Sequence, residues 1–251
     1  MDATFALRLG VLLVRPAALV AAAPPLGGAY TPVAVKIGLS LILALILAPM
    51  VPVPAIAGGP MLAAVVCREL LIGTALAMSV RVLLAGVELA GQLAGFQIGF
   101  SYAGAVDPQT GARNNLVATL YTNVALLTFL AFNGHHHLLR AVARSYSSMP
   151  IGLGGIDASL GELVARSLGA IFVLGAQMAA PIVIVLLIVE LGLGLVTRAA
   201  PALNMMIIGF PVRLLAGLVV LAATISVVPA VTRSATPALI DLATRLARAF
   251  R

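Results

Sequence analysis

The chain has 251 residues, of which 62% are hydrophobic and only 9% are charged, and its formal net charge is +7. A soluble domain averages roughly 45–50% apolar and about 25% charged residues, so this chain has too few polar side chains to cover a soluble fold. The composition excludes a disordered chain, a coiled coil and an ordinary cytosolic enzyme, and it predicts a polytopic membrane protein.

Six or seven apolar stretches follow one another, each close to the ~20 residues that cross the hydrocarbon core of a bilayer. They cover residues 5–23, 33–51, 62–84, 85–106, 116–133, 168–197 and 202–230. The first imitates a secretory signal, but Arg15 interrupts it, which favours a retained membrane helix. The third and fourth are continuous in sequence and form either one long helix or a tight hairpin. The pattern predicts an all-α fold of about six to seven hydrophobic helices in hairpins.

Two polar connections separate these stretches, one at residues 106–115 and one at about 140–166. Residues 237–251 carry arginines together with apolar residues at helical spacing. This pattern predicts a basic amphipathic C-terminal helix, and its positive charge places that helix in the cytoplasm. No loop is long enough to bury a core of its own, so residues 1–251 are predicted to form a single domain that includes this helix.

Small residues recur with a four-residue period at Gly91, Gly95 and Gly99. Positions four apart lie on one face of a helix, and glycine there lets a second backbone approach closely. Two interpretations remain open with equal weight. The glycines pack against another helix of the same chain, or they form a subunit interface.

Three glutamates interrupt the apolar stretches: Glu69, Glu88 and Glu190. A charge at the centre of a bilayer costs about 2.5–3.5 kcal/mol by insertion scales, so each should face protein or water. A proton relay, a bond across subunits and a position outside the bilayer all remain possible roles. The neighbouring Arg68 and Arg81 favour structural pairing, and Gln92 shares a helix face with Glu88. The predicted helix-packing or subunit-interface residues are Glu69, Glu88, Gly91, Gln92 and Gly95.

Other candidate sites are weak. Three neighbouring histidines, at 135–137, point about 100° apart on a helix and cannot all bind one metal ion, so they indicate a helix end at the water boundary. A single cysteine excludes an intrachain disulfide, and no catalytic or nucleotide-binding motif is present, so neither a cofactor nor an enzyme activity is expected. The dispersed basic residues do not form a nucleic-acid surface.

The segment at residues 201–211 interrupts an apolar stretch twice with proline. Broken backbone at membrane depth must be buried in protein or line a wet cavity, because lipid cannot satisfy freed amides. A surface turn between two spans is the alternative, and the nearby Arg198 and Arg213 could snorkel to the interface.

Several sequence blocks resemble the FliR family of flagellar biosynthesis proteins, whose injectisome counterpart is the SctT family. The resemblance begins at Arg15, continues through residues 69–73, 91–100 and 106–108, and is most specific at 132–135, 150–152, 198–201 and 208–211. The family-motif residues are Asn133, Gly134, His135, Pro150, Pro201, Asn204, Gly209, Phe210 and Pro211.

The resemblance implies a subunit of the flagellar type III protein export gate. One such subunit joins FliP-like and FliQ-like subunits in a helical, pore-forming hetero-oligomer of the bacterial inner membrane and flagellar basal body. Its expected partners also include an FlhB-like switch protein, unfolded flagellar export substrates and membrane lipid. The assembly stands largely above the membrane plane, although its helices are apolar enough to be taken for spans.

The resemblance also implies that the loop at residues 99–115 helps to close the pore. The loop residues that match are Gly99, Phe100, Asp107, Pro108, Gln109, Gly111 and Asn115. An injectisome gate subunit is one alternative function. An ion or solute transporter that uses intramembrane glutamates is another, from a different class.

Overall fold

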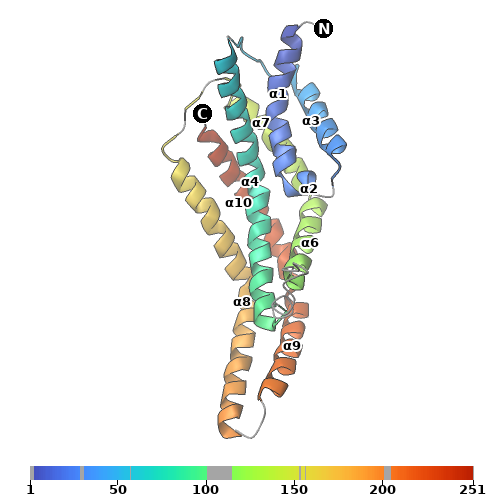
Figure 1. The fold of residues 1–251 in the computed structure, drawn as a ribbon, viewed down its shortest axis with the longest axis vertical. Helices are drawn as coiled ribbons and strands as arrows, with labels where there is room; N and C mark the ends of the chain where they lie inside the picture. Colours follow the sequence, from blue (N-terminus) through green and yellow to red (C-terminus); the bar gives the residue numbers. More distant parts are fainter. Residues whose placement is uncertain are drawn as a thin grey trace. The chain divides into compact units, whose positions relative to one another are not determined.

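The computed structural model describes residues 3–28, 31–56, 58–100, 115–152, 154–155, 157–200 and 205–250. Within these ranges the chain is helical and contains no strand, which confirms the predicted all-α fold. The helices, labelled in Figure 1, are α1 (Ala3–Ala22), α2 (Pro24–Gly27), α3 (Val33–Leu47), α4 (Gly59–Ile98), α6 (Leu116–Ala131), α7 (Gly134–Ser148), α8 (Leu160–Ala199), α9 (Met205–Thr224) and α10 (Val227–Arg248).

Four helices in the described ranges are long and apolar enough to cross a membrane: α1, α4, α8 and α9. The pair α6 and α7, bent by 64° at residues 132–133, would make a fifth span if the two helices are taken together. This number is below the predicted six or seven for two reasons. The helix α3 has only 15 residues, and the third and fourth apolar stretches form one helix.

That helix, α4, runs without a break over 40 residues, which is about 60 Å at 1.5 Å per residue. The tight hairpin left open by the sequence therefore does not form. Pro60 lies in the first turn, where a missing N–H disrupts no helical hydrogen bond. The helix ends at Gly99, whose φ of 109° favours glycine. The amide of Phe100 then donates to the carbonyl of Gly95 over 2.9 Å, which satisfies the last turn.

The predicted polar connection at residues 140–166 is wrong over most of its length. Its first part belongs to α7 and its last part to α8, so only residues 149–159 connect the two helices. The error has a physical cause, because the serines and arginines of α7 suggested a loop. Leu138, Val142, Tyr146 and Met149 nevertheless recur at helical spacing and are buried.

The chain beyond residue 200 also differs from its predicted elements. The stretch at 202–230 divides into α9 and the beginning of α10, with a turn at residues 225–226. The amphipathic C-terminal helix therefore begins at Val227, ten residues before the predicted boundary, and continues through Pro237. Its last turn carries Arg245 and Arg248, as the charge pattern predicts.

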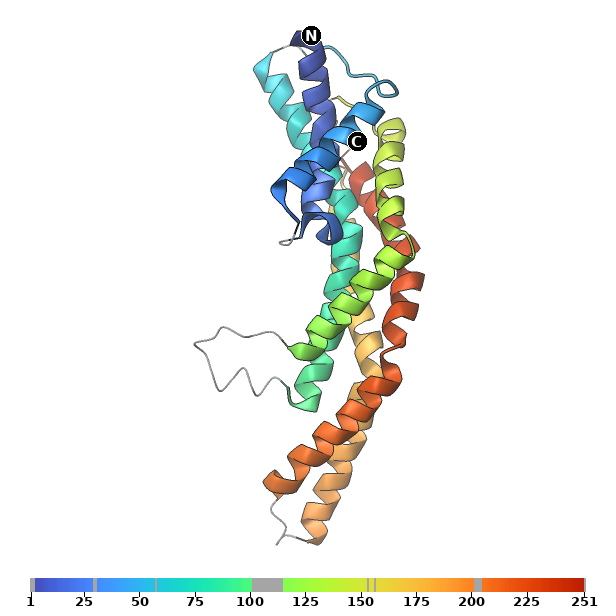
Figure 2. The same cartoon turned by 90° about the vertical axis from the view of Figure 1, so that its right-hand side faces the viewer.

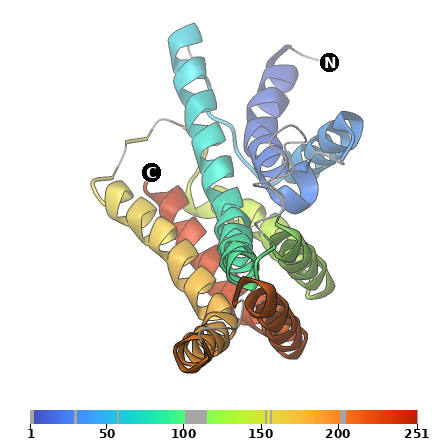
Figure 3. The same cartoon turned by 60° about the horizontal axis from the view of Figure 1, so that its bottom comes forward.

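The residues divide into two compact units, and each is discontinuous in sequence. Unit 1 comprises Met1–Val82, Phe129–Leu168 and Ala235–Arg251, and unit 2 comprises Leu83–Thr128 and Gly169–Ser234. In unit 1, α1 packs along α3 and also contacts α2 and α7 (Figures 1 and 3). In unit 2, α9 returns beside α8 (Figure 2). The prediction of a single domain stays a prediction.

The apolar helices differ greatly in how much of their surface the chain itself covers. The most apolar part of α4 is 67% buried, whereas those of α8 and α9 are only 17% and 6% buried. Large apolar side chains such as Leu195 and Val219 are more than two-thirds exposed. Since monomeric soluble proteins rarely expose such continuous apolar surfaces, α8 and α9 must be covered by lipid or by other chains.

Candidate functional site

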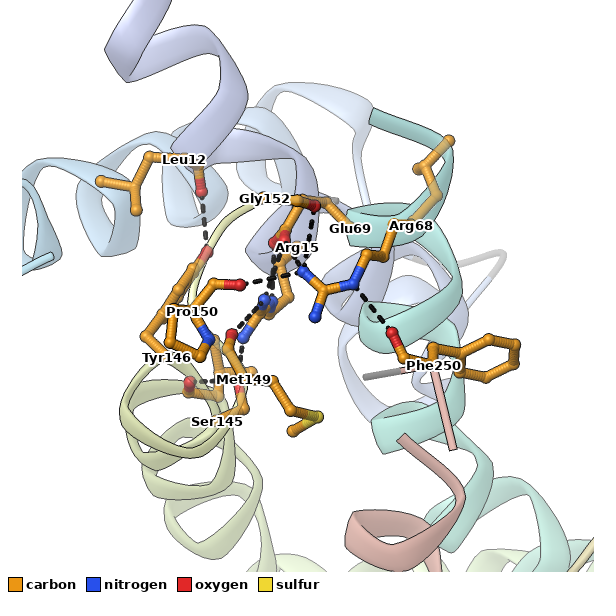
Figure 4. Close-up of polar contacts among 12 residues, drawn as sticks. Leu12, Arg15, Arg68, Glu69, Ser145, Tyr146, Met149, Pro150, Gly152 and Phe250 are labelled. Atoms are coloured by element: carbon orange, nitrogen blue, oxygen red, sulfur yellow. Dashed lines mark hydrogen bonds and ion pairs between the residues drawn. The ribbon is translucent and has the colours of Figure 1, made fainter. Parts of the chain in front are cut away.

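A buried ion pair joins α1 to α4 in unit 1 (Figure 4). Arg15 and Glu69 both have fully buried side chains. Nε of Arg15 donates to Oε2 of Glu69 over 2.7 Å, and Nη2 donates to Oε1 over 2.9 Å. This two-pronged geometry matches the planar guanidinium to the carboxylate, and it is the strongest form of such a pair.

The other donors of Arg15 bind α7 and the residue that follows it. Nη1 donates to the hydroxyl of Ser145 over 2.7 Å, and Nη2 also donates to the carbonyl oxygen of Met149 over 2.9 Å. The guanidinium carbon lies 4.1 Å from the centre of the Tyr146 ring, within the range of a cation–π interaction. The charge of Arg15 is therefore surrounded by partners from α4, from α7 and from Met149, which follows α7.

Arg68 extends this cluster to the end of the chain. Its Nε donates to the carbonyl oxygen of Phe250 over 2.8 Å. Its Nη1 donates to the carbonyl oxygens of Pro150 and Gly152 over 2.9 and 3.2 Å, as Figure 4 shows. Nη1 also lies 3.9 Å from Oε1 of Glu69, so one carboxylate faces two arginines.

Two backbone features explain why α1 can approach these partners. Pro16 has no N–H, so the carbonyl oxygen of Leu12 loses its partner within α1. The hydroxyl of Tyr146 donates to that oxygen over 2.9 Å. Gly73, one turn after Glu69, lies directly against the backbone of Arg15, and a Cβ there would overlap the Arg15 carbonyl oxygen.

The cluster has a structural role: it holds α1, α4 and α7 together. Its charged groups are satisfied by other parts of unit 1, and burial of the Arg15–Glu69 pair leaves no surface of either side chain for a substrate. Breaking a buried pair by removing one partner costs about 3–5 kcal/mol, because the other charge stays buried without compensation. The sequence-based pairing of Glu69 with Arg68 found the minor partner and missed Arg15, Ser145 and Gly73.

A polar groove of about 250 Å³ lies between α4 and α6 in unit 2. Among its lining residues are Glu88 and Gln92 from α4 and Thr119, Thr122 and Asn123 from α6. The side-chain amide of Gln92 donates to Oε1 of Glu88 over 3.2 Å. The groove joins the predicted pair of Glu88 and Gln92 to polar side chains of α6 that the sequence analysis did not single out.

Asn115 also lines this groove, and it fixes the start of α6. Its Nδ2 donates to the carbonyl oxygen of Gln92 over 3.1 Å, and its Oδ1 accepts the amide of Val117 over 3.0 Å. Asn115 is therefore both an N-cap and a link between two helices. Of the predicted loop residues, Gly99, Phe100 and Asn115 are described, and Asp107, Pro108, Gln109 and Gly111 lie outside the described residues.

The predicted glycines bring α4 against α6 within the chain. A Cβ on Gly91 would overlap the backbone of Ala118, and one on Gly95 would overlap the side chain of Asn115. This is the first of the two interpretations that the spacing left open. A subunit interface at these two glycines would have to displace α6.

The third glutamate, Glu190, is paired across the hairpin of α8 and α9. Its Oε1 lies 2.5 Å from Nη2 of Arg213, and both side chains are about one-third exposed. From the sequence, Arg213 could snorkel to the interface; in the structure it is the counter-charge of Glu190. A charge pair on two apolar helices lowers the cost of placing either residue in an apolar environment.

The family-motif residues lie at several separate positions. Asn133 adopts the left-handed conformation, with φ of 56°, at the bend between α6 and α7. Gly134 lies against the ring of Phe129, where a Cβ would overlap the ring atoms. Pro150 presents its carbonyl oxygen to Arg68. His135 begins the histidine run in the first turn of α7, so the run lies at a helix end, as predicted.

The remaining motif residues lie before α9 or in its first two turns. Gly209, Phe210 and Pro211 are helical, and α9 continues through Pro211, so the predicted second break does not occur. Pro211 lies in the second turn, where its missing N–H removes only one helical hydrogen bond. The remaining two motif residues, Pro201 and Asn204, lie outside the described residues. In the described part of the chain, no three His, Cys, Asp or Glu side chains converge on a metal site.

Comparison with known proteins relates this architecture to bacterial export. Residues 6–238 match the model of the family described as "Bacterial export proteins, family 1". The chain is 34% identical over 214 residues to the flagellar biosynthetic protein FliR of Escherichia coli, covering 84% of this chain and 81% of that protein.

Two further relatives carry the same name. The FliR protein of Pectobacterium carotovorum is 33% identical over 221 residues, which cover 86% of this chain and 83% of that protein. The protein of Bacillus subtilis is 34% identical over 172 residues, which cover 66% of each chain. The region that the family model matches includes Arg15 on α1, Glu69 on α4 and Ser145 on α7. The chain belongs to the FliR family of bacterial export proteins.

Proposed function

We propose that the chain is a non-enzymatic subunit of the flagellar type III protein export gate, placed in the bacterial inner membrane at the flagellar basal body. Its proposed partners are FliP-like and FliQ-like subunits and an FlhB-like switch protein, and its proposed cargo is unfolded flagellar proteins. Family membership supports an export role, and the names of the relatives favour the flagellum over an injectisome.

The observation that carries the assembly proposal is the uncovered apolar surface of α8 and α9. A helix pair of this kind gains stability when its apolar face is buried, whether by lipid or by other helices. The Glu190–Arg213 pair lies within the same hairpin and is only partly exposed. Sister subunits would cover this apolar face. Because Glu190 and Arg213 neutralise each other, covering the face would bury no unpaired charge.

We further propose that residues 99–115 close the conduit when no substrate passes. Both ends of this segment are anchored in unit 2. Gly99 ends α4 in a hydrogen-bonded turn, while Asn115 caps α6 and binds the α4 backbone at Gln92. A plug that must return to its closed position requires such attachment, and Gly99 and Asn115 supply it at the two ends of the segment.

Deletion of residues 107–111 tests the plug. The complex should assemble with its partners as before, while ion leak through the inner membrane rises, because the shortened segment no longer fills the conduit. Leak is measured as conductance of cells or vesicles that contain the co-expressed subunits. Replacement of the same five residues by glycine and serine separates the loss of length from the loss of side chains. A correctly assembled complex with unchanged leak would contradict the proposal.

Co-purification tests the assembly itself and separates the gate from a transporter. A gate subunit should elute from a sizing column in a large complex that contains FliP-like and FliQ-like chains. A carrier that used Glu88 or Glu190 should elute as a monomer or a small homo-oligomer and should move a solute by itself. That second result would overturn the proposed function.

A further inference from the structure

A cavity of about 530 Å³ lies in unit 1 between the first half of α1 and the turn that follows α3. Its volume falls within the range of roughly 300–1,000 Å³ that is usual for ligand sites. The lining residues are Phe5, Arg8, Leu9, Leu12, Ala48, Pro49, Met50, Val51, Pro52 and Val53. Apart from Arg8 these side chains are apolar, so the cavity has one cationic group and no anionic side chain.

Arg8 is available to bind an anion. Its side chain is exposed, and within the described part of the chain it has no hydrogen-bond or ion-pair partner. Arg15 and Arg68, the arginines of the buried cluster in unit 1, are by contrast bound to a carboxylate and to carbonyl oxygens. An unpaired guanidinium at a cavity whose other side chains are apolar favours a ligand with an anionic group, since Arg binds phosphate oxygens with two parallel hydrogen bonds.

The backbone of the turn supplies a second polar group. Pro52 and Pro54 have no N–H, and the N–H of Val53 between them has no backbone partner among the described residues. This turn is not helical, so its amide is free to donate. Val53 lines the cavity, so its N–H offers a ligand there a backbone donor, in addition to the Arg8 guanidinium.

An apolar stripe leads away from the cavity along α3. Ile42, Ile46 and Met50 are spaced four residues apart, and their exposed fractions are 56%, 60% and 77%. Ile42 and Ile46, four apart on α3, lie on one face of that helix, and Met50 lies in the turn that follows it. Met50 lines the cavity itself, so the stripe is continuous with it. The ligand that fits an anion-binding cavity with an apolar exit is amphiphilic.

We propose that this cavity binds an anionic phospholipid. Arg8 and the Val53 amide bind the headgroup phosphate, the cavity holds the glycerol and the upper part of the acyl chains, and the chains continue along Ile42, Ile46 and Met50. A basic pocket beside membrane helices is the type of site that anionic headgroups occupy. Such a lipid would cover apolar surface of α3, a helix that is too short to cross a bilayer.

Native mass spectrometry of the purified export complex tests this site. The complex is stripped of lipid in detergent and then titrated with phosphatidylglycerol or with phosphatidylcholine that has the same acyl chains. Phosphatidylglycerol should bind to the unaltered chain with at least about tenfold higher apparent affinity, because its net negative charge attracts the Arg8 guanidinium, whereas the choline ammonium of phosphatidylcholine neutralises the charge of its own phosphate and is repelled by Arg8. Arg8→Ala should abolish that preference, and Arg8→Lys should restore part of it.

Two further variants locate the effect. Val53→Trp should fill the cavity and reduce binding of both lipids, while Arg144→Ala, an exposed arginine of α7 outside the cavity, should leave both affinities unchanged. If Arg8→Ala prevents assembly, the comparison of the two lipids on the unaltered complex still decides the question.

Three results would overturn the proposal. The first is equal binding of the two lipids by the unaltered complex. The second is displacement of phosphatidylglycerol by free glycerol 3-phosphate, which would identify a site for soluble anions. The third is that a photoreactive group at Met50 labels a neighbouring subunit and no lipid, which would identify a protein as the occupant.

Discussion

Arg15 shows how a single charged side chain can fix the arrangement of helices in a hydrophobic protein. Its bonds reach Glu69 on α4 and Ser145 on α7, across 54 and 130 residues of sequence. A buried ion pair is weak evidence for net stability, because desolvation offsets the attraction between the charges. Its geometric demand is specific, however, so the pair selects one arrangement of α1, α4 and α7 among the many that apolar contacts would permit.

Removal of one charge from the pair tests this role. Glu69→Gln or Arg15→Gln should lower the free energy of unfolding by about 3–5 kcal/mol, because the remaining charge stays buried. The measurement is denaturation in detergent, followed by helical circular dichroism. The control is Glu162→Gln, whose pair with Arg166 is 65% and 61% exposed and should cost no more than about 1 kcal/mol. Equal losses in both variants would show that the pair is not important for stability.

The bond between Tyr146 and Leu12 yields a prediction about backbone satisfaction. Tyr146→Phe leaves the Leu12 carbonyl without a partner, which should cost about 1–3 kcal/mol. In the Pro16→Ala background the new N–H of residue 16 can donate to the same oxygen. The cost of Tyr146→Phe should then fall below about 1 kcal/mol. A double-mutant cycle in detergent measures the difference, and strictly additive effects would contradict the explanation.

Among the helices, α4 depends most on small side chains. Gly91 and Gly95 touch α6, and Gly73 touches α1. The sequence predicted the close approach at Gly91 and Gly95 from their period. The sequence could not identify the partner, because the same pattern serves contacts within and between chains. The contact of Gly73 was not predicted, because Gly73 does not belong to a series of glycines at four-residue spacing. Its position one turn after Glu69 could have indicated a close helix contact there.

Enlarging one of these glycines tests the contact between α4 and α6. Gly91→Ala should lower the free energy of unfolding by about 1–3 kcal/mol, because a Cβ there overlaps the backbone of Ala118. The matched control in unit 2 is Gly169→Ala on α8, where no atom lies within 4 Å of the added Cβ. That variant should be neutral or stabilising by up to about 1 kcal/mol, since alanine favours helix. Equal effects of the two variants would contradict the predicted contact.

At the scale of the whole molecule, the uncovered faces of α8 and α9 indicate that the chain is part of an assembly. Their side chains have the apolar character of a protein interior but are exposed in the isolated chain. In unit 1, by contrast, the buried charges of Arg15, Glu69 and Arg68 are paired within the unit. The two units therefore differ in what they still require from their surroundings.

A charge on the uncovered face should block assembly without unfolding the chain. Leu195, which is 69% exposed, makes no large contribution to the core, so Leu195→Arg should keep its helical content. The chain should nevertheless be lost from the complex with FliP-like and FliQ-like partners, because an arginine would be buried there without a counter-charge. The control is Ser147→Arg on the exposed side of α7. Normal recovery of Leu195→Arg in the complex would place this face outside the interface.

The sequence by itself determined the class of protein, the helical architecture and the family. Composition and helical periodicity are local properties, and the motif blocks at 132–135 and 208–211 could be recognised without coordinates. The prediction from sequence was wrong in α7, where two patterns point to different structures. Its serines and arginines suggested a loop, although its apolar residues recur at helical spacing. The sequence also could not choose between one helix and a hairpin at residues 62–106, because both are equally apolar.

Only the tertiary structure decided which charges meet. The ion pairs of Arg15 with Glu69 and of Arg213 with Glu190 are formed by chain packing, as is the bond from Arg68 to the carbonyl oxygen of Phe250, and no short-range pattern encodes them. The physical reason is that an arginine in an apolar helix predicts only that a partner must exist. The identity of that partner depends on which helices pack together, and this in turn depends on distant features such as Gly73 and the carbonyl oxygen that Pro16 leaves free.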